Sequence, residues 1–243
     1  MNRKWRESAW RPEYHRAISS VLGRIIATQR RPILAAAKVI ADVIEKNGIL
    51  YLLGSGHSLA VAMEAHGRAG GMVPVEIVFD RSFGKLERLS GYAKILFEQY
   101  DIPRNSALIV ISNSGRNALP VEMALEAKAR GIPVIALTSL AHSRSVSSRQ
   151  GGGKRLFEIA DIVIDNCGVP GDAIVRLRGV PERVGPTSAV AGTFIMNLVM
   201  VETIRRLRKA GVPPPILISA NLDGSDDHNR KLRRRYRGRI RGL

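Results

Sequence analysis

The chain has 243 residues, enough for one α/β domain with a large core, and 45% of them are hydrophobic, which excludes general disorder. The single cysteine, Cys167, excludes a disulfide framework and a zinc site built from several cysteines. The formal net charge is +17, and residues 229–243 contain eight basic and no acidic side chains. Such a segment can bind RNA or DNA phosphates. A solvated terminal helix is the commoner explanation, and no zinc-finger spacing or aromatic-rich RNA-binding motif accompanies it.

Apolar spacing predicts helices and strands that alternate along most of the chain. Helices are predicted at 12–47 (two helices, the second starting at Pro32), 58–68, 85–100, 120–130, 187–209 and 222–235. Strands are predicted at 49–53, 75–79, 107–111, 134–137 and 162–164, with an edge strand at 173–177, and a polar loop at 138–153. Continuous apolar strands between helices indicate a parallel sheet that is covered on both faces.

We therefore predict a doubly wound α/β fold, a three-layer αβα sandwich. A helical extension at 1–48, a central domain at 49–220 and a basic helix and tail at 221–243 are the expected divisions. The longest apolar stretch, 188–201, is too short to span a membrane, and we expect it to be a helix buried on all sides. Residues 1–16 lack the apolar core of a signal peptide, so we expect a soluble, cytoplasmic protein.

Two turns rich in glycine and hydroxyl groups follow predicted strands. Gly54–Ser58 (GSGHS) follows the strand at 49–53, and Ser112–Asn117 (SNSGRN) follows the strand at 107–111. Ligands of such folds gather at the carboxyl ends of the strands. Because helix N-termini supply unpaired N–H groups and hydroxyls add further donors, both turns favour a phosphate monoester as ligand.

Nucleotide-binding alternatives fit these turns less well. In GSGHSL the third glycine of a G-x-G-x-x-G dinucleotide fingerprint is replaced by Leu59, which removes the close packing of helix on strand that this glycine allows. Asp80 would be the partner of the ribose in that interpretation. No P-loop spacing occurs around Gly151-Gly152-Gly153-Lys154. We therefore expect neither a nicotinamide enzyme nor an ATPase.

Together, G-x-G-x-S after the first strand and S-x-S-G-x-N after a later one resemble the sugar isomerase (SIS) domain family, doubly wound domains that bind phosphosugars. The segments ISNSGRNALPVEMALEAKARGIPVIALTS, HSRSVSSR, DNCGVPGDA, VGPTSAVAGTF and NLDGSDDHNRKL extend the resemblance. They are similar to a bacterial branch whose members are often labelled only as SIS-domain or phosphosugar isomerase proteins. The resemblance covers residues 49–240.

The resemblance implies that Ser58, Ser112, Ser114 and Asn117 hold the phosphate, and that Asn113 offers a backbone N–H beside them. Short hydroxyls and glycine backbone suit an anion independently of the family, although a plain N-cap is the alternative for each serine. The predicted phosphate- and sugar-binding residues are Ser55, Ser58, Ser112, Asn113, Ser114, Asn117, Thr138, Ser139, Thr187 and Ser188. For the last four, contact with sugar hydroxyls and capping of a helix or strand stay open as alternatives.

The catalytic residues of a related branch do not carry over to this chain. Phosphoheptose isomerases have a histidine metal ligand and a glutamate base on the helix after the first loop, and here Glu64 and Arg68 stand at those positions. We therefore predict no metal and no other cofactor. The predicted acid–base candidates are Glu64, His57 and His142, with Asp172, Asp226, Asp227 and His228 as further ones.

Three functions stay open on the sequence. The first is an aldose–ketose phosphate isomerase that moves a proton through an enediol. The second is a lyase or etherase that acts on an amino-sugar phosphate, and the third is a phosphosugar sensor without catalysis. A sugar phosphate is the expected ligand. The N-terminal helices carry an apolar stripe, and the resemblance implies that they pack against a second copy, so a homodimer or homotetramer is the expected assembly. Nucleic acid is a lesser candidate partner for the basic tail, and no membrane partner is expected.

Overall fold

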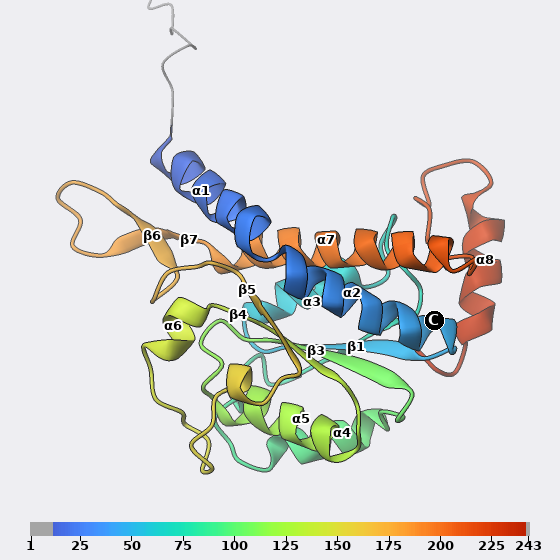
Figure 1. Cartoon of the computed structure of the whole chain (residues 1–243), viewed down its shortest axis with the longest axis horizontal. Helices are drawn as coiled ribbons and strands as arrows, with labels where there is room; N and C mark the ends of the chain where they lie inside the picture. The colour runs from blue at the N-terminus through green and yellow to red at the C-terminus, as the bar shows by residue number, and fades with distance from the viewer. Residues whose placement is uncertain (1–11, 242–243) are drawn as a thin grey trace, which may run out of the picture.

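The computed structural model describes residues 12–241 and contains a five-stranded parallel sheet between two layers of helices (Figure 1). The strands are β1 (Ile49–Gly54), β2 (Val75–Val78), β3 (Ser106–Ile111), β4 (Val134–Thr138) and β5 (Ile162–Asp165). All neighbouring pairs in the sheet are parallel. The predicted doubly wound α/β fold is confirmed.

The helices form two layers because the apolar side chains of each strand alternate between the two faces of the sheet. They are α1 (Glu13–Thr28), α2 (Arg30–Glu45), α3 (Ser58–Ala65), α4 (Tyr92–Tyr100), α5 (Ala118–Ala129), α6 (Leu140–Arg144), α7 (Ser188–Lys209) and α8 (Ser225–Tyr236). Helices α2, α3 and α7 share one core with the sheet, and α4 and α5 share the other, on the opposite face (Figure 1).

The N-terminal helices contribute to the core of the domain. Helix α2 buries Ala36 and Ile40 completely against the sheet and α7, and it completes one of the two helical layers. Helix α1 continues past the sheet and packs on α7 (Figure 1). Residues 1–11, the first part of the predicted extension, lie outside the described part of the chain.

The strand order β2-β1-β3-β4-β5 identifies where a ligand binds in this class of fold. The chain leaves β1 in one direction across the sheet to reach β2, and then continues in the opposite direction from β3 onward. The crevice outside the carboxyl ends of β1 and β3 is therefore the topological switch point, where doubly wound folds bind their ligands. The two glycine-hydroxyl turns follow these two strands.

Some predicted elements differ from the structure. The helix expected at 85–100 starts only at Tyr92, because Gly84 and Gly91 adopt positive φ angles of 84° and the segment before Tyr92 folds as turns. Helix α3 ends at Ala65, and Gly67 with φ 63° follows it. The polar loop predicted at 138–153 contains the short helix α6, whose N-cap is Ser139.

Two predictions about the last third of the chain were wrong. Helix α7 is not buried on all sides, since Val190 is 40% and Val201 52% exposed. The segment predicted as an edge strand forms β6 (Ala173–Arg176), which pairs antiparallel with β7 (Arg183–Pro186) in a separate hairpin that packs beside α1 (Figure 1). No helix within residues 12–241 is long and apolar enough to cross a membrane.

Candidate functional site

The first glycine-hydroxyl turn is a tight connection between β1 and α3. Gly54 has no room for a side chain, because a Cβ there would lie 2.4 Å from the Ser58 carbonyl oxygen. Gly56 has φ 56°, a left-handed conformation that glycine adopts without strain. As a result the chain reverses within a few residues, and Ser58 begins α3 at the carboxyl end of the sheet.

The second turn connects β3 to α5 and faces the first. Gly115, with φ 57°, lies close to its neighbours, because a Cβ there would meet Leu156 at 3.1 Å and Ser143 Oγ at 3.2 Å. Its backbone N–H donates to Ser112 Oγ at 3.1 Å, which closes the turn before α5 begins. Both turns therefore end at a helix N-terminus, where unpaired N–H groups favour an anion.

A cavity of about 190 Å³ lies between the two turns. It opens at the switch point of the sheet, and it brings together most of the residues predicted to hold a phosphate. Its lining consists of Leu53, Ser55, Ser58, Glu87, Ile111, Ser112, Asn113, Ser114, Asn117, Pro120 and His142. Six of the ten predicted binding residues, and one of the three predicted acid–base residues, thus lie around one space.

Several donors in this cavity have no acceptor within residues 12–241. The hydroxyls of Ser58 and Ser114 make no hydrogen bond to any other described residue, and neither do the backbone N–H groups of Asn113 and Ser114. Donors that belong to residues around a cavity and have no acceptor within the protein can form hydrogen bonds with a ligand. A phosphate group, with several acceptor oxygens, matches such a set.

The position of Asn113 is fixed by groups around it. Its side-chain Oδ1 accepts a hydrogen bond from Asn166 Nδ2 at 2.9 Å, and its carbonyl accepts from Thr138 Oγ1 at 3.2 Å. Asn166 is itself 3% exposed and accepts from the Gly168 N–H at 2.8 Å. Hydrogen bonds hold both the side chain and the carbonyl group of Asn113. The position of its backbone N–H therefore does not depend on a bound ligand.

Glu87 is a carboxylate in the cavity that the sequence analysis did not identify. Its Oε1 accepts a hydrogen bond from Asn117 Nδ2 at 2.8 Å, and its carbonyl accepts from the Leu119 N–H at 2.9 Å. The predicted helix at 85–100 would have placed Glu87 among surface positions. Nothing in the local pattern indicates that this segment turns back to reach α5.

The turn segment that carries Glu87 is organised by Asp80. Its carboxylate accepts from the backbone N–H groups of Ser82 and Gly84, both at 2.9 Å, from Tyr92 Oη at 3.0 Å and from Ser55 Oγ at 3.3 Å. Burial acts to raise the pKa of Asp80, but the hydrogen bonds from Ser82, Gly84 and Tyr92 outweigh it and hold the pKa below its ordinary value. A carboxylate surrounded in this way is structural, so Asp80 is not available to a ribose.

His142 is the acid–base candidate that the structure places in the cavity. It lies on α6, and its Nδ1 is buried with no hydrogen-bond partner among the described residues. Burial lowers the pKa of His142, Asp172 acts to raise it, and Arg116 lowers it further. The net shift is downward, so the imidazole is neutral at neutral pH and carries one donor and one acceptor nitrogen.

Three arginines beside the cavity make it attractive to anions. Arg149 donates to Asn117 Oδ1 at 3.2 Å, and its N–H donates to the Arg116 carbonyl at 2.7 Å. The pKa of the exposed Arg149 guanidinium is lowered, first by partial desolvation and then by the positive charges of Arg116 and Arg88. Arg116 is part of SNSGRN. A positive charge beside this turn could therefore have been predicted from the sequence.

Three predicted binding residues are buried and have internal partners instead. Thr138 donates to the Asn113 carbonyl, and Ser139 Oγ donates to the Gly168 carbonyl at 2.8 Å and caps α6. Thr187 Oγ1 lies 2.9 Å from Asp172 Oδ1. All three are fully buried, and none lines the cavity. Ser139 is thus a helix cap, whereas tertiary hydrogen bonds hold Thr138 and Thr187.

His57 and Ser188 line a narrow crevice next to the cavity, which shares Ser58 and Asn113 with it. Ser188 Oγ donates to Asp172 Oδ2 at 2.7 Å. The His57 side chain is exposed and makes no hydrogen bond within the described residues. These two residues therefore lie at the edge of the candidate site.

Glu64 does not reach the cavity. Its carboxylate forms an ion pair with Arg68, which follows the end of α3, and accepts a hydrogen bond from Asn197 Nδ2 of α7 at 3.3 Å. The side chain of Glu64 therefore faces α7 rather than the space between the turns. The position that aligns with a metal ligand in a related branch is occupied here by a paired surface carboxylate.

The further acid–base candidates either have a structural role or lie away from the cavity. Asp172 caps α7 by accepting from the N–H groups of Thr187 at 2.9 Å and Ser188 at 2.8 Å. Burial acts to raise the pKa of Asp172, but hydrogen bonds from Ser188 and Thr187 outweigh it and lower the pKa.

Asp226, Asp227 and His228 lie on α8, which contacts the segments that enter the strands. Arg235 of α8 bonds to Asn47, immediately before β1. This is the opposite end of the sheet from the cavity (Figure 1). Within residues 12–241, no three His, Cys, Asp or Glu side chains are grouped so that they could hold a metal ion.

Comparisons with known proteins agree with this geometry. Residues 13–139 match the family model described as SIS domain. A UPF0309 protein of Shouchella clausii is 37% identical over 238 residues, which cover 94% of this chain and 97% of that protein.

Solved structures of similar fold come from more distant proteins. The phosphoheptose isomerase GmhA of Neisseria gonorrhoeae has a TM-score of 0.54 and 18% identity, with 78% of this chain and 93% of that chain covered. The Vibrio vulnificus NanR protein complexed with ManNAc-6P has a TM-score of 0.52 and 12% identity, with 92% of this chain and 67% of that chain covered.

Proposed function

This chain belongs to the SIS-domain family, and on that premise we propose that the cavity between its two glycine-hydroxyl turns binds a sugar phosphate. The observation that carries the proposal is the convergence of unpaired donors at the switch point. Ser58, Asn113 and Ser114 all line one cavity, and among residues 12–241 the hydroxyls of Ser58 and Ser114 and the N–H groups of Asn113 and Ser114 have no hydrogen-bond partner. Two proteins of similar fold, a phosphoheptose isomerase and a protein complexed with ManNAc-6P, support the same ligand class.

We further propose that the bound sugar phosphate undergoes aldose–ketose isomerisation. This reaction needs one base that transfers a proton between C1 and C2 and one group that exchanges a proton with the carbonyl and hydroxyl oxygens. Glu87 and His142 line the same cavity and fit these two roles. Asn117 holds the carboxylate of Glu87 through a hydrogen bond of 2.8 Å, and the lowered pKa of His142 keeps its imidazole neutral.

The proton balance of the reaction closes on these two residues. The Glu87 carboxylate takes the proton from the carbon next to the carbonyl, and the carbonyl oxygen receives a proton from His142, which gives the enediol. The neighbouring hydroxyl then returns a proton to His142 as the Glu87 carboxyl protonates the former carbonyl carbon. The enzyme ends in its starting state, and no oxidant or reductant is consumed.

Binding and catalysis are separated by one series of experiments. A thermal-shift panel of pentose, hexose and heptose phosphates and their amino derivatives identifies a stabilising ligand. NMR of that ligand in D₂O then detects exchange at C1 or C2. Exchange with interconversion of the two sugars supports the isomerase, and exchange with loss of a substituent supports the lyase or etherase instead. Binding without exchange supports the sensor, and no binding by any sugar phosphate refutes the whole proposal.

We also propose that the protein assembles with copies of itself through the face formed by α1, α3 and α7. Apolar side chains are exposed on each of these helices: Ile26 and Met63 are each 57% and Val201 52% exposed. Burial of such groups between copies would remove apolar area from water. Light scattering at micromolar concentration should give at least a dimer, and a monomer at that concentration would contradict the proposal.

A further inference from the structure

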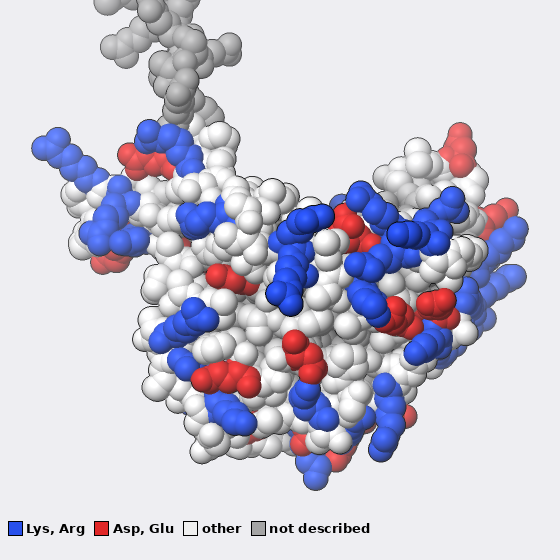
Figure 2. Space-filling model, viewed as in Figure 1, with Lys and Arg blue, Asp and Glu red and all other residues white. Residues whose placement is uncertain are grey.

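Helix α8 carries a second concentration of positive charge at the end of the sheet opposite the candidate site. Figure 2 shows basic side chains gathered at the edge of the molecule formed by α8. A groove of about 300 Å³ runs along this helix and is lined by Ala220, Asp226, Asn229, Arg230, Arg233, Arg234 and Arg237. The phosphosugar site has no residue in common with this groove.

One face of α8 attaches the helix to the domain. Tyr236 is 1% exposed, and Asn229 forms two hydrogen bonds with the backbone of Ile218, at 3.0 and 2.9 Å. The guanidinium group of Arg235 bonds to Asn47. At the C-terminal end of the helix, Glu76 accepts a hydrogen bond from the Arg241 N–H at 2.7 Å. Because these contacts fix the helix, the side chains on its other face are presented on a preformed surface.

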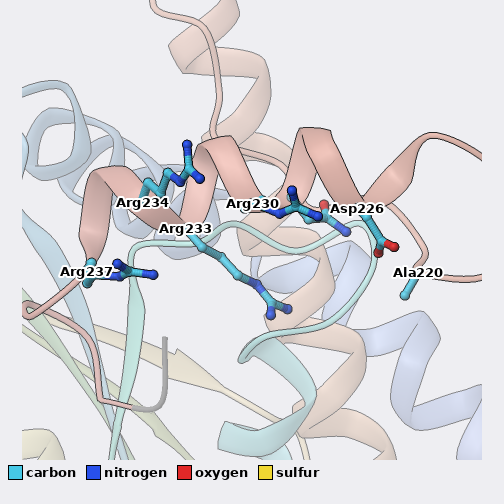
Figure 3. A pocket seen from close by; sticks show the side chains of 7 residues that line it. Ala220, Asp226, Arg230, Arg233, Arg234 and Arg237 are labelled. Atoms are coloured by element: carbon cyan, nitrogen blue, oxygen red, sulfur yellow. The ribbon is translucent and has the colours of Figure 1, made fainter.

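The arginines on that other face have almost no internal partners. Among the described residues the guanidinium groups of Arg233, Arg234 and Arg237 form no hydrogen bond or ion pair, and Arg230 has only an exposed pair with Asp227 at 3.4 Å. Figure 3 shows Arg230, Arg233, Arg234 and Arg237 along α8, with Arg233 and Arg234 extending to different sides of the helix and Asp226 near its start. Like charges three or four residues apart on a helix repel one another, and an anion bound beside them relieves that repulsion.

The spacing of these arginines fits a chain of phosphates better than a single one. Residues three or four positions apart on a helix lie about 4.5 to 6 Å apart along its axis, so the four guanidinium groups extend over two turns of α8. Guanidinium groups bind phosphate in two-point contacts. An extended strand can place successive phosphates along such a row, whereas one phosphate could engage only one or two of the arginines.

We infer that the arginine face of α8 binds the phosphate backbone of single-stranded nucleic acid. Tyr236 of α8 is buried, and no aromatic side chain lines the groove. Without a ring in the groove lining on which bases could stack, recognition rests on charge and is independent of sequence. Binding should therefore depend steeply on salt.

Fluorescence anisotropy of a labelled, mixed-sequence RNA strand of about 12 nucleotides tests this inference on the full chain. Each neutralised phosphate of a single strand contributes about −0.7 to the slope of log K against log salt, so the wild-type slope should lie between about −2 and −3. In Arg233→Gln/Arg237→Gln the slope should shrink by about 1.4. Arg176→Gln/Arg178→Gln removes the same charge from the exposed β6–β7 hairpin and should bind as the wild type does.

Three results would overturn the inference. One is equal binding by both double variants, and another is no binding by the wild type at about 50 mM salt. The third is a preference for another anion, seen as binding to inorganic tripolyphosphate or to phosphatidylserine vesicles without binding to the strand. Circular dichroism of each variant establishes that it is folded, so a loss of binding is attributable to the missing charges.

Discussion

The side-chain amide of Asn117 donates a hydrogen bond to the carboxylate of Glu87, with 2.8 Å between Nδ2 and Oε1. This contact joins the phosphate-type turn after β3 to a segment thirty residues earlier in the chain. It places a carboxylate in the same cavity as the hydroxyl groups of the two turns.

Replacement of Glu87 by glutamine should abolish the chemistry and leave the binding. The variant keeps the shape of the side chain and loses the base, so proton exchange at C1 or C2 should fall by about 10²–10⁴-fold. Deuterium exchange measures the rate, and thermal shift measures the retained binding. Glu64→Gln is the matched control, because Glu64 is paired with Arg68 outside the cavity, and it should stay within a few-fold of the wild type. A Glu64 variant that is inactive beside an active Glu87 variant would reverse the assignment.

Loss of either free hydroxyl should weaken phosphate binding. Ser58→Ala and Ser114→Ala each remove a donor to a charged ligand, which costs about 1.5–3 kcal/mol, or roughly 10- to 100-fold in Kd. Titration calorimetry with the stabilising sugar phosphate measures the change. Ser19→Ala, on the exposed face of α1, is the control and should bind as the wild type does. If all three variants bound alike, the two serines would be plain caps.

The activity should depend on the neutral form of His142. Because its pKa is lowered from 6.5, chiefly by burial, the imidazole stays neutral until the pH falls below that value. The acid limb of kcat/KM, which reports the free enzyme, should therefore lie below pH 6.5 and should change in His142→Gln. An acid limb above pH 6.5, or a pH profile of His142→Gln equal to that of the wild type, would show that a group other than His142 titrates.

Asp80 should be needed for both stability and activity. Asp80→Asn removes the charge that receives hydrogen bonds from Ser82, Gly84 and Tyr92, which should cost about 1–3 kcal/mol of unfolding free energy in urea. Because the folded pKa of Asp80 is lowered, its contribution is present above the ordinary value of 3.8 and is lost as the pH falls below it. The segment that carries Glu87 should loosen at the same time, so exchange activity should fall.

Asp42→Asn provides the comparison for Asp80. Asp42 is an exposed carboxylate of α2 whose ion pair with Lys38 is worth about 0.3–0.5 kcal/mol, so its loss should change neither stability nor activity appreciably. Equal effects of the two substitutions would show that Asp80 does not organise the segment after β2.

The repeating apolar strands and the two turns were sufficient to predict the parallel sheet, the end of the sheet at which the cavity lies and six of the residues that line it. Both depend on local patterns, namely apolar runs that end in glycine and hydroxyl residues. Glu87 could not be found in the same way. Its place depends on Asp80, which draws the backbone amides of the following residues into turns and overrides the helical spacing at 85–91.

The roles of the buried hydroxyls also depend on distant partners. For Thr187 and Ser188 the sequence left ligand contact and capping open, and in the structure Asp172, fifteen residues before Thr187, accepts their hydrogen bonds. Ser139 likewise donates to Gly168 across the end of the sheet. A short polar residue at the end of a strand has the same local pattern whether its partner is a ligand or a carbonyl, and only the tertiary structure separates the two.

A thermal-shift comparison of the wild type with Ser58→Ala/Ser114→Ala, across the panel of sugar phosphates, tests the central claim most directly. At a ligand concentration of 100 Kd, binding should stabilise the wild type by about 2.7 kcal/mol, and the double variant should show little of that shift while its melting temperature without ligand is unchanged. A panel in which no sugar phosphate stabilises the wild type, or one that stabilises both proteins equally, would contradict the claim that this cavity is a phosphosugar site.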